Sequence, residues 1–176
     1  GRCRELLLPG SRVILSHAAR EGRKTDFDLV TVYKGDMLVN IDSQAPNAIA
    51  QNYLRARFPD ATIRREAAYG HSRLDFHVQD GDMSLYAEVK GCTLEENGLA
   101  LFPDAPTQRG VRHLNSLMDA VKEGHGALAL FIIQMRPVRA FSPHDRMHPA
   151  FGRALRAASA AGVEVAAIDC YVREDG

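Results

Sequence analysis

The sequence has few cysteines and no long apolar run. Its three cysteines, Cys3, Cys92 and Cys170, are odd in number and lack C-x-x-C spacing, which argues against a disulfide framework and against a zinc ribbon. The longest apolar stretch, residues 127–133, is much shorter than a membrane-spanning helix, and no signal-peptide pattern opens the chain. We therefore expect a cytoplasmic protein that makes no membrane contact.

The sequence also lacks an excess of charge of either sign, because 22 basic residues balance 22 acidic ones. A field from the whole protein therefore cannot attract a polyanion, and nucleic acid would have to be held by local basic patches. Four of the basic residues are lysines, so arginine supplies most of the cations. Arginine is the better bidentate phosphate ligand, although the composition of the source genome explains this preference equally well.

Apolar periodicity and turn signals predict an α/β domain preceded by a small β unit. The β unit has strands at 11–16, 27–33 and 37–42, and a linker at 43–47 follows it. The second part has a helix at 48–58, a strand at 62–67, a hairpin of 73–78 and 83–90, a helix at 107–123, a strand at 127–135, a helix at 148–160 and a strand at 163–172. This order predicts a mixed central sheet with helices on both faces, and domains at 1–43 and 44–176.

Acidic residues and a lysine gather on the predicted hairpin: Asp75 on the first strand, then Glu88-Val89-Lys90 on the second. An Asp80-Gly81 turn between the strands would pair Asp75 with Tyr86 and Arg73 with Glu88. Because opposite side chains share a face and strands alternate with period two, we expect Arg73, Asp75, Tyr86, Glu88 and Lys90 to project together, with Asp75 and Glu88 as diagonal neighbours.

Two carboxylates on one face of a sheet can bind a divalent cation. Hard oxygen ligands suit Mg²⁺ or Mn²⁺, with water completing the octahedron. Such an ion polarises a phosphoryl oxygen and lowers the pKa of a bound water, and Lys90 would orient that water or neutralise charge in the transition state. The pattern predicts Asp75, Glu88 and Lys90 as catalytic residues; the alternative is a pair of solvated strand carboxylates.

Several segments in order resemble a known family. Residues 72–76 (SRLDF), 88–90 (EVK), 102–110 (FPDAPTQRG), 113–114 (HL) and 141–143 (FSP) are similar to those of the sugar fermentation stimulation protein (SfsA) family, and the Asp75 and Glu88-Val89-Lys90 pair resembles the PD-(D/E)XK core of restriction-endonuclease-like nucleases. The resemblance extends over nearly the whole chain. It differs at Gln108, where the family normally has an acidic residue.

The resemblance implies an N-terminal OB-like β domain, a C-terminal nuclease-like domain and a DNA-binding role linked to sugar metabolism. Since the family's β domain begins well before the equivalent of Gly1, we expect this domain to be incomplete here. The superfamily also implies that the backbone carbonyl of Val89 is a further metal ligand.

Four further residues are candidates for the site. Glu66 would be a third carboxylate for metal, or an exposed charge that pairs with a neighbouring arginine. Arg73 would clamp a phosphate, or pair with Glu88 across the strands. Arg109 and His113 are four residues apart and share one helix face, where they would contact nucleic acid or form surface pairs.

The preferred hypothesis is a nucleic-acid-binding protein with a Mg²⁺- or Mn²⁺-dependent nuclease site, acting on DNA or RNA, with DNA favoured over RNA. One alternative is a non-catalytic DNA-binding regulator of sugar metabolism genes. Another is a small-molecule or protein-interaction module with a relict site. The oligomeric state stays open, with a homodimer as one option.

Overall fold

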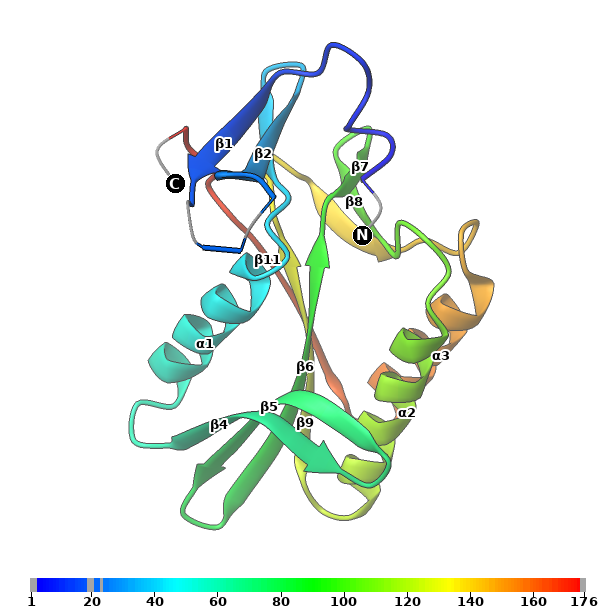
Figure 1. The fold of residues 1–176 in the computed structure, drawn as a ribbon. Helices are drawn as coiled ribbons and strands as arrows, with labels where there is room; N and C mark the ends of the chain where they lie inside the picture. The colour runs from blue at the N-terminus through cyan, green and yellow to red at the C-terminus, as the bar shows by residue number, and fades with distance from the viewer. Residues whose placement is uncertain (1–2, 19–20, 23, 175–176) are drawn as a thin grey trace.

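A mixed five-stranded sheet forms the centre of the computed structural model, which describes residues 3–18, 21–22 and 24–174 (Figure 1). The strands lie in the order β11-β9-β6-β5-β4. Their bounds are β4 (Thr62–Tyr69), β5 (Ser72–Asp80), β6 (Met83–Cys92), β9 (Gly126–Ile133) and β11 (Glu164–Asp169). The pairs β4/β5 and β5/β6 are antiparallel, and β6/β9 and β9/β11 are parallel. The predicted fold class, a mixed α/β sheet, is confirmed.

Helices cover both faces of this sheet (Figure 1). On one face α1 (Ala45–Arg57) packs through Ala50 and Leu54 against an apolar cluster of β5, β6 and β9. On the other face α2 (Gln108–Lys122) and α3 (Pro149–Ala160) pack through Leu114, Leu117 and Phe151 against a second cluster. In the described part of the chain, no helix is both long enough and apolar enough to cross a membrane.

Two smaller sheets lie beyond one end of the central sheet (Figure 1). The first contains β1 (Val13–His17), β2 (Phe27–Lys34) and β3 (Met37–Asn40), and the second contains β7 (Leu94–Glu96), β8 (Leu99–Phe102) and β10 (Ala140–Pro143). Val32 and Val39 of the N-terminal sheet share a buried cluster with Ala100 and Met135. Strands β7, β8 and β10 were not predicted from the sequence, because each is only three or four residues long.

The predicted linker at 43–47 is mostly the first turn of α1, which begins at Ala45. Pro46 occupies the first turn of this helix. Proline is tolerated there because the first backbone N–H groups of a helix have no partner within the helix. The prediction of a linker was therefore wrong over residues 45–47.

The turn between β5 and β6 consists of Gly81 and Asp82, with Asp80 opposite Met83. Gly81 has a φ of 53°, as the first central residue of a type II′ turn requires, whereas the prediction made Gly81 the second residue of an Asp-Gly turn. This moves the register by two residues, so that His77 and not Asp75 lies opposite Tyr86. The predicted pairing was wrong. Because the register moves by an even number of residues, Asp75 and Glu88 still project from the same face of the hairpin.

Strand β5 changes its facing at Asp75. Leu74 belongs to the cluster beneath α2 and α3, whereas Phe76 belongs to the cluster beneath α1. In a regular strand these two residues would share a face. The neighbouring strand shows the matching irregularity, since Glu66 has a φ of 54° and lies between the paired residues Arg65 and Ala67. Both strands are therefore twisted where the candidate carboxylate lies.

Candidate metal centre

A cavity of about 550 Å³ opens where β5 and β6 separate. Five predicted site residues line it, Asp75, Glu88, Val89, Lys90 and Arg109. Its other walls are Ser43, Gly91, residues 102–107 and Gly110. The cavity thus collects residues from β5, β6, the start of α2 and the loop before α2. The contribution of Ser43 was not predicted from the sequence.

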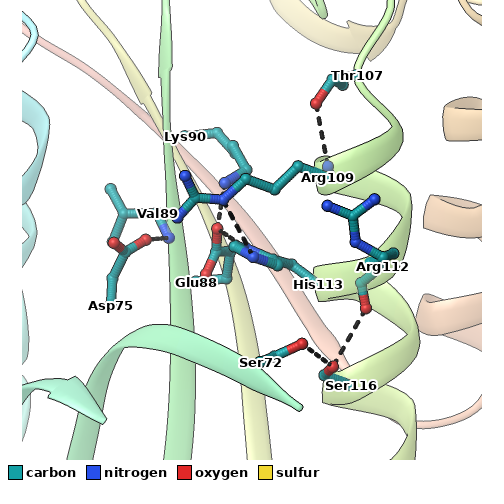
Figure 2. A network of polar contacts seen from close by, with 11 residues as sticks. Ser72, Asp75, Glu88, Val89, Lys90, Thr107, Arg109, Arg112, His113 and Ser116 are labelled. Atoms are coloured by element: carbon teal, nitrogen blue, oxygen red, sulfur yellow. Dashed lines mark hydrogen bonds and ion pairs between the residues drawn. The ribbon is translucent and has the colours of Figure 1, made fainter. Parts of the chain in front are cut away.

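The carboxylate of Asp75 lies beside the backbone of β6 (Figure 2). Its Oδ2 accepts a hydrogen bond of 2.8 Å from the backbone N–H of Val89. Regular pairing of the two strands ends at Phe76 and Ala87, so this side chain satisfies an N–H group just beyond the ladder. Asp75 therefore bridges the two strands beyond the end of their regular pairing, and it lines the cavity.

Glu88 lies at the centre of a polar network (Figure 2). Its side chain is 4% exposed, and its Oε1 contacts both Lys90 Nζ and His113 Nδ1. Glu88 Oε2 is buried and has no hydrogen-bond partner among the described residues. A buried carboxylate oxygen without a partner is costly unless a ligand satisfies it. One oxygen of Glu88 is therefore anchored and the other is available.

The two carboxylates have opposite pKa shifts. Burial raises the pKa of Asp75, and the nearby charge of Glu88 raises it further. Burial alone would raise the pKa of Glu88 as well, but the hydrogen bond from His113 and the charge of Lys90 outweigh it and hold that pKa below its usual value. Glu88 is thus the carboxylate whose charge the protein itself stabilises, while Asp75 needs a cation to offset its burial.

Helix α2 brings His113 and Arg109 to this network. The helix begins after Thr107, whose Oγ1 accepts a hydrogen bond of 3.0 Å from the N–H of Gly110. A Cβ at Gly110 would lie 3.1 Å from the ring of Phe151, so glycine lets α2 approach α3. Arg109 Nε donates to His113 Nε2 over 3.3 Å. Arg109 and His113 therefore lie on one face of α2, as their spacing predicted.

His113 lies in a different environment from the predicted one. It is 5% exposed and faces Glu88, so the structure does not place it on a surface that nucleic acid could reach. The missed signal is its position in the buried stripe of α2, which runs through Gly110, Leu114 and Leu117. Arg109 is exposed and lines the cavity, where a phosphate could reach it.

The structure does not bring Arg73 or Glu66 into the cavity. The prediction that Arg73 shares the face of Glu88 was wrong, because the adjacent Ser72 and Leu74 face α2 and the strand alternates. Arg73 is 70% exposed and Glu66 is 61% exposed, and the two form a loose ion pair of 3.9 Å. This contact corresponds to the alternative of an exposed Glu66 that pairs with an arginine, here Arg73.

The donor set fits a hard divalent cation. Asp75 and Glu88 line one cavity, and none of the residues that the structure describes satisfies the buried Oε2 of Glu88. Mg²⁺ and Mn²⁺ are commonly bound by one or two carboxylates, with water in the remaining positions. The residues that would hold the ion are therefore Asp75 and Glu88, with backbone and water oxygens in addition.

Comparison with known families gives two matches that together span nearly the whole chain. The family model described as the sugar fermentation stimulation protein RE domain matches residues 44–176, and that described as the SfsA N-terminal OB domain matches residues 1–41. A sugar fermentation stimulation protein homolog of Desulfitobacterium hafniense (strain DSM 10664 / DCB-2) is 48% identical over 177 residues, which are 99% of this chain and 78% of that protein. A homolog of Clostridium botulinum (strain Hall) is 48% identical over 180 residues, with the same coverage.

A solved structure has a similar fold. It is described as the structure of Pyrococcus furiosus SfsA in complex with Ca²⁺, and it superimposes with a TM-score of 0.85 at 28% sequence identity. The match covers 96% of this chain and 74% of that one.

Proposed function

Because the chain belongs to the sugar fermentation stimulation protein family, we propose that it is a metal-dependent phosphodiesterase that acts on nucleic acid. One observation carries the proposal: Glu88 has a buried oxygen that no described residue hydrogen-bonds, in a cavity that it shares with Asp75 and Lys90. Two carboxylates that bind a divalent cation, together with a lysine, can promote phosphodiester hydrolysis. They also form the pattern of the PD-(D/E)XK nucleases that the sequence resembles.

Asp75 Oδ and Glu88 Oε2 would be the protein ligands of one Mg²⁺ or Mn²⁺, with the Val89 carbonyl as a backbone ligand. The Ca²⁺ complex of the Pyrococcus furiosus relative supports a divalent cation in this family. The cation would polarise a phosphoryl oxygen and lower the pKa of a bound water. Asp75 and Glu88 supply the negative charge that binds it.

Lys90 and Arg109 would act on the phosphodiester itself. Lys90 Nζ lies against Glu88 and lines the cavity, so it can hold the attacking water or neutralise a phosphoryl oxygen. The attacking water releases a proton to solvent as its oxygen forms a new bond to phosphorus, the opposite P–O bond breaks, and the departing oxygen takes a proton from solvent. The exposed Arg109 can hold a neighbouring phosphate by paired N–H donors.

A cleavage assay tests the proposal. Labelled single- and double-stranded DNA and RNA are incubated with Mg²⁺, Mn²⁺ or chelator, and we expect cleavage that the chelator removes, with DNA preferred to RNA. Glu88→Gln and Lys90→Ala should abolish it. Glu164→Gln is the matched control, because Glu164 pairs with Arg57 on the surface. Undiminished cleavage by both site variants would sink the proposal.

A second candidate function, a non-catalytic DNA-binding regulator of sugar metabolism genes, is favoured by a different observation. Among the described residues, no group of three or more histidine, cysteine, aspartate or glutamate side chains is placed to hold a metal ion. In that case Lys90 and Arg109, which both line the cavity, would retain phosphate binding without hydrolysis. This function predicts salt-dependent DNA binding that chelator does not change, with no cleaved product from any substrate.

A further inference from the structure

We infer that His113 is a positioning residue that holds Glu88 Oε1 so that Oε2 faces a cation, and that Arg109 keeps His113 in the hydrogen-bonding state this requires. The inference rests on the proposed function, since it concerns how Glu88 is prepared as a metal ligand. It also changes the role of His113 from a nucleic-acid contact to a partner of the ligand.

The side chain of Glu88 is held asymmetrically. Both of its side-chain contacts, from Lys90 and from His113, are made to the same oxygen, Oε1. Oε2 is buried without a partner among the described residues. A carboxylate anchored through one oxygen cannot rotate freely about its last bond, so the second oxygen has a defined direction. The contacts of Lys90 and His113 with Oε1 therefore determine that Oε2 is the oxygen that faces a cation.

The hydrogen bonds through His113 run in one direction. A guanidinium has donors and no acceptor, so Arg109 Nε must donate to His113 Nε2 over the 3.3 Å that joins them. That nitrogen then carries no proton, and the ring proton resides on Nδ1. Nδ1 faces Glu88 Oε1. An oxygen of an ionised carboxylate can only accept a hydrogen bond, so Nδ1–H is the donor. Arg109 thus selects the neutral tautomer that donates to Glu88.

The histidine is also held rigidly. His113 is buried in the α2 interface, in the same stripe as Leu114 and Leu117. Figure 2 shows its ring between Glu88 and the helix, with Arg109 extending over it from the preceding turn. A ring held on two sides has a fixed orientation. The arrangement is the one by which outer residues orient carboxylate and histidine ligands in metal sites.

The closing experiment measures Mn²⁺ affinity by calorimetry, at one pH and without nucleic acid. His113→Ala should weaken binding about 10- to 100-fold, the usual cost of losing a residue that orients a ligand. His113→Asn places an amide nitrogen near the position of Nδ1, so it can still donate to Glu88 and should recover most of the affinity. His113→Gln reaches the Nε2 position and should recover little. His125→Asn is the control, because His125 contacts Tyr69 and Tyr86 and is absent from the cavity lining.

A second readout reports the proton directly. In protein with ¹⁵N-labelled histidine, the His113 signals, assigned by their loss in His113→Asn, should show the Nδ1–H tautomer. Arg109→Met should convert them to a mixture of tautomers. Thermal melts of each variant confirm that it is folded, and the tautomer spectrum of Arg109→Met does not depend on a change in activity.

The outcomes separate this inference from the function on which it rests. If wild-type protein binds no Mn²⁺, the proposed function and the inference both fail. If Glu88→Gln weakens Mn²⁺ binding and His113→Ala does not, the inference alone is overturned. Equal recovery by His113→Asn and His113→Gln, or an Nε2–H tautomer in the wild type, would also overturn it.

Discussion

The two faces of strand β6 differ sharply although their residues alternate along one chain. Leu85, Ala87 and Val89 face α1 and lie in an apolar cluster. Tyr86, Glu88 and Lys90 face α2, and two of them are charged. Packing alone accounts for the first face. The second face contains a desolvated carboxylate, which two cationic or polar partners must compensate.

This difference teaches that stability and chemistry are divided between the two helical layers. In α1, Asn47 hydrogen-bonds the Asp75 carboxyl, whereas the buried Ala50 and Leu54 pack against the apolar face of the sheet; α2 carries both packing residues and His113. A mutation of Ala50 or Leu54 should therefore change stability alone. A mutation of the same size in α2 should change stability and the site together.

The largest expected effect comes from the paired substitutions Leu54→Ala and Leu117→Ala. Both side chains are completely buried, in α1 and α2 respectively, and each loss should lower the free energy of unfolding by about 2–5 kcal/mol. Denaturant titration measures this. Below the unfolding transition, Leu54→Ala should retain wild-type Mn²⁺ affinity and Leu117→Ala should not. If Leu54→Ala and Leu117→Ala changed Mn²⁺ affinity equally, the proposed difference between the α1 and α2 layers would be wrong.

The next effect concerns Lys90→Met, which keeps most of the aliphatic stem and removes the charge. If Lys90 stabilises the transition state, kcat for metal-dependent cleavage should fall about 100-fold or more. Lys122→Met is the control, because Lys122 pairs with Asp119 on the surface of α2. A fall of similar size in both variants would show that the charge acts at long range and not within the site.

Asp75→Asn should separate stability from activity. Because the folded-state pKa of Asp75 is raised by burial and by Glu88, the ionised carboxylate destabilises the fold at neutral pH. Asparagine can still accept the N–H of Val89, so this variant should melt at a higher temperature at pH 7 while losing metal-dependent cleavage. The gain should vanish as the pH falls and wild-type Asp75 takes up its proton. A lower melting temperature at pH 7 would contradict this account.

The smallest effect is expected for Ser72→Ala. Ser72 Oγ and Ser116 Oγ form a hydrogen bond of 2.7 Å that joins β5 to α2. Its loss should cost about 0.5–1.5 kcal/mol of unfolding free energy, since Ser116 keeps its contact with the carbonyl of Arg112. Cleavage and metal affinity should be unchanged, which thermal melts and calorimetry on the same preparation can test.

Much of the fold could be predicted because long elements carry strong periodic signals. The predicted helices at 107–123 and 148–160 correspond to α2 and α3, and the apolar run at 127–135 corresponds to β9. The hairpin register could not be predicted, because Gly81 can stand first or second in a two-residue turn and each choice moves the pairing by two residues. The change of facing at Asp75 breaks the period-two rule itself.

For the candidate site, Asp75, Glu88 and Lys90 could be grouped because an even shift in register preserves the face. The position of Arg73 could not be derived, since it lies beyond the twist that begins at Asp75. The burial of His113 against Glu88 depends on how closely α2 approaches the sheet. That distance depends on long-range packing, in which Gly110 and Phe151 take part.

The twist at Asp75 has a consequence for how the molecule opens. Because Leu74 and Phe76 are anchored in different clusters, β5 cannot detach locally from one side without disturbing the other. Amide hydrogens on both sides of Asp75 should therefore exchange with solvent only when the whole domain unfolds, and at a common rate. Asp75 would then lie in the segment whose amide hydrogens exchange most slowly, although its carboxylate lines a cavity open to water.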